Sequence, residues 1–298
     1  MKKRVLVLGG LEAWLTVYVD AFPNAAPQTV FCRGFHETIG GTGFGKAMNL
    51  SRLGFDVCFH SPLGEDELAK TVRSELSGHL TLLFDIDPAG TRRQIHIINR
   101  EGERLSYFVN HGSPEPTLDR VRLEQVIAES DIVIVNTINY TKTLIPVIKE
   151  HGKEIWCDIH DYDYSKTYYL AYIRCADYLQ MSSCCMPNYR QFMQRQIDSG
   201  KKLVVCTHAH RGATALTPDG KWIDVPIIER YVRCDPNGAG DGFFSGLLFG
   251  LESGFPIEIA VRCGMVVGGL SVTTPEASYP DLSVQLLLKD YRESYGPL

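Results

Sequence analysis

The chain has 298 residues, a hydrophobic share of 44% and a formal net charge of -5. Such a chain buries one large core or two modest ones, and its acidic balance argues against a nucleic-acid partner, which requires clustered positive charge. We find no apolar stretch of the roughly 18 residues needed for a membrane helix, and the apolar run Val5–Leu8 is too short for a secretory signal. We therefore expect a cytoplasmic protein with neither a membrane nor a nucleic acid as partner.

Short aliphatic runs recur along the chain and alternate with helical stretches. They lie at Val5–Leu8, Val57–His60, Ile132–Asn136, Glu154–Asp158, Tyr178–Met181 and Leu203–Thr207. Strands that are apolar throughout and separated by amphipathic helices favour a mostly parallel sheet with helices on both faces. The predicted fold class is therefore α/β, a three-layer α/β/α sandwich, in a single domain spanning residues 1–298.

Two segments break this alternation. Trp14–Glu37 and Thr91–His111 are rich in β-branched and aromatic residues and contain turn signals, and the second alternates like a hairpin. We expect them to form a small antiparallel sheet inserted in the α/β core, built from about residues 12–38 and 89–111, and to act as a lid.

A glycine-rich segment, Gly40 to Ala47 (GGTGFGKA), opens the predicted helix Lys46–Leu53. Gly40 to Lys46 fits the P-loop spacing G-x-x-x-x-G-K, but Ala47 stands where a Ser or Thr would bind Mg²⁺, and residues 34–39 make a poor buried strand. We therefore prefer a close approach of the glycine backbone to a ligand, which a Cβ would obstruct.

The sharpest chemical signal is Asp235 to Phe243 (DPNGAGDGF), which precedes the predicted helix Phe243–Leu251. Small residues at a helix N-terminus expose N–H groups, and the helix dipole there favours an anion such as phosphate. Asp241 follows this cradle, where its carboxylate is placed to accept the proton of an attacking hydroxyl. The alternative is that Asp241 caps the helix and the glycines form a tight turn.

Taken in chain order, these segments resemble the PfkB, or ribokinase-like, family of carbohydrate and nucleoside kinases. Gly40-Gly41, with a helix ending in Arg52-Leu53-Gly54, resembles the first motif of the family. Asp235 to Phe243 resembles the second motif, D-T-x-G-A-G-D-x-F. Pro62 to Glu67 resembles the turn that follows the next strand in the family, and weaker resemblances fall in register at residues 158–161, 207–213 and 270–275.

The resemblance implies an ATP-dependent kinase, with Mg²⁺ on the ATP phosphates, that acts on a sugar-like or nucleoside-like acceptor. By this resemblance Asp241 is the catalytic base, and the amides of Gly238, Ala239 and Gly240 form the anion hole. The substrate-binding positions that it implies are Trp14, Gly40, Gly41, Gly45 and Asp241. The ATP-binding positions that it implies are Thr207, Ala209, Arg211, Gly212, Asn237, Gly238, Gly240, Cys263 and Thr274. It assigns no protein ligand to a metal, and it allows a homodimer through the lid.

The chain departs from the family pattern in the acceptor pocket. Trp14 stands where sugar kinases have a substrate-binding Asp, and Gly45 replaces the Asn that follows the first glycine pair. Trp14 either stacks on an unusual acceptor or packs the lid onto the sheet. Pro236 replaces the usual Thr beside a monovalent-cation site, so dependence on such an ion stays open. A non-catalytic ligand-binding protein that has kept the fold is the alternative function.

Overall fold

A nine-stranded sheet forms the body of the computed structural model, which describes residues 2–76 and 80–298. Its strand order is β13-β12-β11-β10-β9-β8-β1-β4-β5. Every neighbouring pair from β11 to β5 is parallel, whereas β12 and β13 pair antiparallel at one edge. The strands are Arg4–Leu8 (β1), Asp56–Leu63 (β4), Thr81–Ile86 (β5), Ile132–Asn136 (β8), Ile155–Asp158 (β9), Tyr178–Ser182 (β10), Leu203–Thr207 (β11), Ala213–Leu216 (β12) and Trp222–Val225 (β13). All six predicted strands are thus confirmed as parallel members of this sheet.

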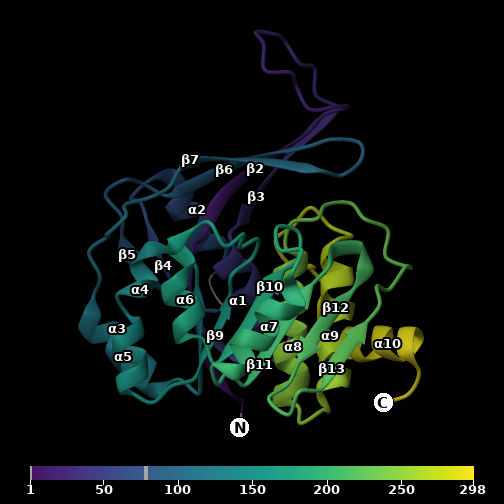
Figure 1. The fold of residues 1–298 in the computed structure, drawn as a ribbon. Helices are drawn as coiled ribbons and strands as arrows, with labels where there is room; N and C mark the ends of the chain where they lie inside the picture. Colours follow the sequence, from purple (N-terminus) through teal and green to yellow (C-terminus); the bar gives the residue numbers. More distant parts are fainter. Residues whose placement is uncertain (1, 77–79) are drawn as a thin grey trace.

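Helices cover both faces of the large sheet, which confirms the three-layer prediction (Figure 1). Alternate residues of β1 point to opposite faces: Val5 and Val7 belong to one hydrophobic core, and Leu6 and Leu8 belong to the other. The first core includes side chains of Thr42–Arg52 (α1), Glu67–Glu75 (α2), Ala239–Glu252 (α8) and Ile257–Ser271 (α9). The second includes side chains of Arg120–Glu129 (α3), Asn139–Lys142 (α4), Ile145–Glu150 (α5), Leu170–Cys175 (α6) and Tyr189–Asp198 (α7).

One further helix and two short 3-10 turns complete the described elements. They are the helix Val284–Tyr295 (α10) and the short 3-10 turns Thr167–Tyr169 (η1) and Ala209–Arg211 (η2). Within the described ranges, no helix combines the length and the apolar character needed to cross a membrane.

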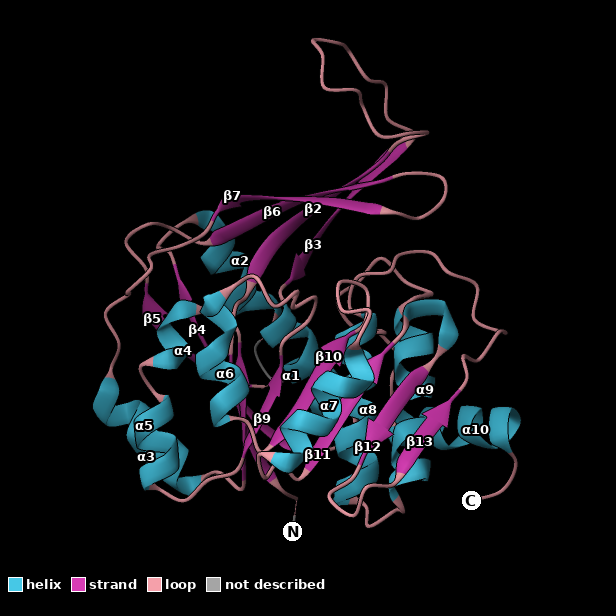
Figure 2. Ribbon diagram, viewed as in Figure 1, coloured by secondary structure: helices cyan, strands magenta, loops and turns pink. Residues whose placement is uncertain are grey.

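A second, four-stranded sheet lies across one end of the large sheet (Figure 2). Its order is β3-β2-β6-β7, made of Glu12–Tyr18 (β2), Gly34–Gly40 (β3), Arg92–Ile98 (β6) and Arg104–Asn110 (β7). The prediction of an antiparallel sheet is correct for the two hairpins β2–β3 and β6–β7 but wrong for β2–β6, which is parallel. Each hairpin continues a strand of the parallel sheet, β1 or β5, so the first strands of the two hairpins leave in the same direction.

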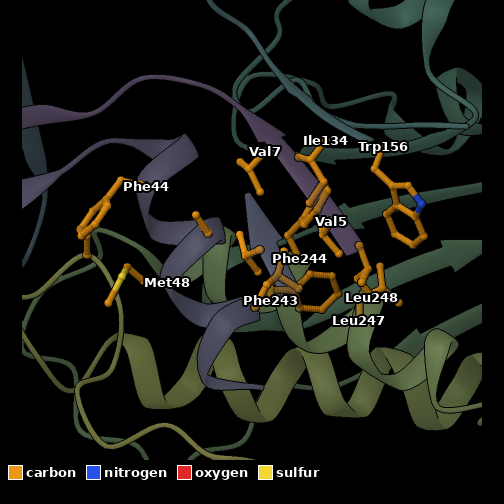
Figure 3. Packing of buried hydrophobic residues seen from close by; sticks show 14 of the residues in the cluster. Val5, Val7, Phe44, Met48, Ile134, Trp156, Phe243, Phe244, Leu247 and Leu248 are labelled. Carbon is orange, nitrogen blue, oxygen red and sulfur yellow. The ribbon is translucent and has the colours of Figure 1, made fainter. Parts of the chain in front are cut away.

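Packing of α1 and α8 against the large sheet positions the site. Phe44 and Met48 of α1 and Phe243 and Phe244 of α8 belong to the same core as Val5 (Figure 3). Glycines bring α8 and α9 close together, because a Cβ on Gly246 would lie 2.5 Å from the Cys263 carbonyl oxygen. Burial of these aromatic and aliphatic side chains holds the N-terminus of α8 beside the carboxyl ends of the parallel strands.

Candidate active site

A cavity of about 670 Å³ lies between the small sheet and the carboxyl ends of the parallel strands. We call it the cleft. On the side of the large sheet its walls include Asn136, Asp158, Ser182 and Thr207, which are the last residues of β8, β9, β10 and β11. Ligands of parallel α/β sheets bind at this edge, where loops and helix N-termini converge.

The N-terminus of α8 opens into the cleft. Gly238 is its N-cap with a left-handed φ of 77°, and a Cβ there would lie 2.6 Å from the Ala277 carbonyl oxygen, so this position requires glycine. The first N–H to bond within the helix is that of Gly242, which donates to the Gly238 carbonyl at 2.8 Å. The N–H groups of Ala239 and Gly240 precede it and have no partner within the helix. This geometry can hold a phosphate.

Asp241 lies in the first turn of α8 and lines the cleft, although its side chain is almost fully buried. Its Oδ1 accepts a hydrogen bond from Lys46 Nζ. The helix-cap alternative is wrong, because Gly238 is the N-cap and no side chain caps this end. Burial raises the pKa of Asp241, and the positive charge of Lys46 acts in the opposite direction. A buried carboxyl with a raised pKa is suited to take up a proton.

Lys46 joins Asp241 to a second carboxylate. Its ammonium lies 3.3 Å from Asp158 Oδ2, at the end of β9. Gln180 Nε2 donates to the same Asp158 oxygen at 3.1 Å and to the Gly240 carbonyl at 3.0 Å. His160 Nδ1 lies 3.3 Å from Asp158 Oδ2. The P-loop spacing drew attention to Lys46, but the residue faces carboxylates rather than a phosphate loop. Because Asp158 and Asp241 are distant from Lys46 in sequence, no local pattern predicts that Lys46 pairs with them.

The glycines of the first motif pack against the protein, and none of the three predicted substrate contacts among them lines the cleft. A Cβ on Gly40 would overlap the indole of Trp14, and one on Gly41, whose φ is 107°, would lie 2.5 Å from the Gly10 carbonyl oxygen. A Cβ on Gly45 would lie 2.9 Å from Asp241 Oδ2. In the structure these glycines allow close approach to other parts of the chain.

Trp14 lies at the border of the cleft, but only 6% of it is exposed. Its Nε1 donates to Glu12 Oε2 at 3.3 Å, and its ring meets the edge of His96 at a centroid distance of 5.0 Å. Glu12 also accepts from Arg92 Nε at 2.9 Å and from Gln94. These contacts favour the packing alternative for Trp14 over stacking on an acceptor.

Two cleft residues on the small sheet, Arg104 and Phe108, were missed by the sequence reasoning, and they line the cleft together with His96. Phe108 is 47% exposed, so its ring is available to a ligand. Burial lowers the pKa of His96 to about 4, and its Nδ1 bonds the Ser106 hydroxyl at 2.9 Å. Arg104 donates to Asn237 Oδ1 beside the N-terminus of α8. The hairpin alternation of residues 91–111 was the available signal, because it places such residues on one face.

A second, smaller cavity of about 290 Å³ adjoins the N-terminus of α8. Four predicted ATP-binding residues line it, namely Thr207, Ala209, Gly212 and Gly240, together with apolar residues such as Ile228 and Met265. The cleft is lined by five of the predicted ATP-binding residues, namely Thr207, Ala209, Asn237, Gly238 and Gly240. Cys263, Thr274 and Arg211 line neither cavity, and Cys263 is fully buried between helices. The two cavities meet at α8, an arrangement that fits a nucleotide base in the apolar cavity and its phosphates at the helix N-terminus.

Residues 2–283 match the model of the pfkB family carbohydrate kinases. The chain belongs to this family. It is therefore a carbohydrate kinase, a phosphotransferase that uses an alcohol group as acceptor, and ATP use is typical of the family. It is 28% identical over 293 residues to the acarbose 7(IV)-phosphotransferase of an Actinoplanes species, covering 91% of this chain and 92% of the relative.

Solved structures of similar proteins confirm the ribokinase-like fold. A microbiome-derived acarbose kinase superposes with a TM-score of 0.84 at 23% identity, covering 98% of this pfkB-family chain and 99% of the other. The ribokinase of Giardia lamblia superposes with a TM-score of 0.83 at 17% identity, again covering 98% and 99%.

Proposed function

We propose that the protein transfers the γ-phosphate of ATP to a hydroxyl of a sugar-like acceptor, with Asp241 as the catalytic base. One observation carries this proposal: the Asp241 carboxylate lines the cleft one residue after the free N–H groups of Ala239 and Gly240. Phosphoryl transfer depends mainly on positioning and on stabilising charge on the transferred group, and this site combines a proton acceptor with an anion cradle.

In this proposal the amides of Gly238, Ala239 and Gly240 form the anion hole, and Arg104 adds positive charge from the small sheet through its contact with Asn237. The small sheet serves as a lid that excludes water from the cleft. The oxygen ligands that Mg²⁺ prefers are supplied largely by the ATP phosphates. The exposed carboxylate of Asp161, which lines the cleft, is the protein group that we propose for contact with this ion.

Two observations favour a sugar-like acceptor. The Actinoplanes relative is named for phosphorylation of acarbose, and its similarity extends over 91% of this chain. The cleft also combines the exposed ring of Phe108 with polar groups such as Gln94, His96, Ser106 and Asn136. A ring that packs on an apolar sugar face, surrounded by hydrogen-bonding groups, is suited to a polyhydroxy compound.

The alternative is a non-catalytic protein that binds the same ligands. The ion pair that engages Asp241 favours it, as do the Trp14 and Gly45 positions, where the usual polar contacts to a sugar are absent. Coupled assays of ADP release separate the two. We expect release of ADP with Mg-ATP and acarbose, ribose or another member of a panel of saccharides and nucleosides. Ligand-induced thermal stabilisation without any ADP release would support the non-catalytic alternative.

We further propose that two copies pair through the outer face of the small sheet. Phe35, Tyr107 and Val109 are all more than 50% exposed on this face, which points away from the cleft. Exposed apolar side chains on one face of a sheet are typical of an interaction surface. Light scattering should report a dimer for the natural chain and a monomer for Tyr107→Asp. A monomer in both cases would refute the pairing.

A further inference from the structure

Lys46 is a fully buried lysine in a site whose chemistry it does not perform directly. Its side chain is 0% exposed, and its ammonium contacts both Asp241 and Asp158. Burying an ammonium is costly unless it is paired and hydrogen-bonded. Because both of its partners line the cleft, the pair concerns the active site rather than the distant core.

The titratable groups that face Asp241 come from three segments. Lys46 approaches from α1, Asp158 from the end of β9, and His160 from the residues that follow β9. The neutral Gln180 amide of β10 and the Ala277 carbonyl complete the surroundings of this part of α8. One lysine is thus shared by two buried carboxylates, with His160 at their exposed side.

The two carboxylates differ in environment. The pKa of Asp158 is lowered, because His160 and Lys46 together outweigh its burial. The pKa of Asp241 is raised, because burial dominates and the negative charge of Asp158 adds to it. Where neighbours push two carboxyl pKa values apart, the group with the higher value is the proton acceptor and the other is a fixed charge.

Gly45 completes this arrangement. A Cβ at this position would lie 2.9 Å from Asp241 Oδ2 and 3.0 Å from the Ala277 carbonyl oxygen. The glycine therefore lets the backbone of α1 approach Oδ2 without a Cβ in contact with it, while the next residue, Lys46, engages Oδ1. Two neighbouring positions of α1 thus give the two oxygens of the Asp241 carboxylate different surroundings.

We propose that Lys46 is a positioning residue that balances the shared charge of Asp158 and Asp241 and occupies Oδ1 of Asp241, which leaves Oδ2 for the acceptor hydroxyl. The proposal rests on the proposed function for the role of Asp241 as base. In the reaction, the hydroxyl proton moves to Oδ2 as the acceptor oxygen bonds to the γ-phosphorus, and ADP leaves with the electrons of the broken P–O bond. Asp158 stays ionised and Lys46 stays protonated throughout.

A thermal double-variant cycle tests the charge balance without any substrate. We compare unfolding of the natural chain, Lys46→Gln, Asp241→Asn and the double variant between pH 5 and pH 8. Without Lys46, the folded-state pKa of Asp241 rises further above its unfolded value, so stability is lost as the pH rises through it. Lys46→Gln should therefore unfold at a lower temperature than the natural chain at pH 8, and the deficit should shrink toward pH 5. Adding Asp241→Asn should recover most of the loss at pH 8.

Lys201→Gln is the matched control, because Lys201 is also a buried lysine but donates to the carbonyl oxygens of Ile173 and Ala176. The loss of unfolding temperature in Lys201→Gln should be independent of pH between pH 5 and pH 8, and adding Asp241→Asn should not recover it. A Lys46→Gln deficit that is equal at pH 5 and pH 8, or one that Asp241→Asn does not relieve, would overturn the proposal.

The kinetic arm follows kcat for ADP release against pH, with acarbose as the probe. Lys46→Gln should shift the acidic limb of the kcat–pH profile to higher pH by roughly 1 unit or more, which is the usual effect of one close charge on a carboxyl. Asp158→Asn removes a like charge and should shift the same limb to lower pH. A uniform fall in kcat with unshifted limbs in both variants would assign Lys46 a structural role only. Absence of turnover by the natural chain with every acceptor would refute the proposed function instead, and the thermal cycle would still decide the charge balance.

Discussion

Replacing Asp241 by Asn separates catalysis from stability in this site. The amide keeps an oxygen that can accept from Lys46, and Lys46 retains Asp158 at 3.3 Å, so no buried charge is left unpaired. The loss of about 3–5 kcal/mol that follows the removal of one partner of an isolated buried pair therefore does not apply. We expect a stability change within about 1 kcal/mol, the scale of one hydrogen bond. In contrast, loss of a general base lowers the rate by about 10²- to 10⁴-fold.

The assay combines coupled ADP release with saturating Mg-ATP, calorimetric titration of ATP and thermal unfolding. Because the N–H groups at the start of α8 are unchanged, the Kd for ATP should stay within about threefold, or ~0.6 kcal/mol. Asp85→Asn is a suitable control, since Asp85 pairs with His60 at 3.0 Å and does not line the cleft. That control should keep the natural kcat. An Asp241→Asn variant with more than a tenth of the natural kcat would refute Asp241 as the required base.

Four further predictions address the walls of the site. Gly45→Asn should lower kcat by about tenfold or more with little change in acceptor KM, because its Cβ would press on Asp241 Oδ2; steady-state kinetics with natural values would contradict this. Phe108→Ala should raise the acceptor KM by about tenfold, or ~1.4 kcal/mol, without changing the KM for ATP; an unchanged acceptor KM would show that the ring does not touch the acceptor. Gly238→Ala should lower the unfolding temperature, because the φ of residue 238 is 77°. Gly240→Ala should fold normally, because the nearest atom to the added Cβ is Gln180 Nε2 at 3.9 Å, and it should weaken ATP binding in titrations. Equal stability of the two variants would refute this difference. Trp14→Ala should cost about 3–5 kcal/mol in denaturant unfolding; a raised acceptor KM at full stability would show instead that the indole binds the acceptor.

The sequence alone determined the elements that depend on local pattern. Aliphatic runs buried on both faces predicted the parallel strands, because such strands leave no polar face for solvent. Asp235 to Phe243 predicted the exposed N–H groups of α8, because small residues at a helix start act through the backbone of that same segment. The hairpin alternation of residues 91–111 likewise predicted β6 and β7.

Only the tertiary structure decided which side chains meet. Lys46 and Asp241 lie 195 residues apart, and they pair because α1 and α8 pack on the same face of the large sheet. The sequence allowed Trp14 either to stack on an acceptor or to pack the lid, and its neighbours Gly40 and His96, which come from other strands, bury its ring. The parallel pairing of β2 with β6 also depends on the directions of β1 and β5 rather than on either hairpin. Local backbone conformation depends on consecutive residues, so the sequence predicts it. Charge pairing and burial depend on segments that only folding brings together.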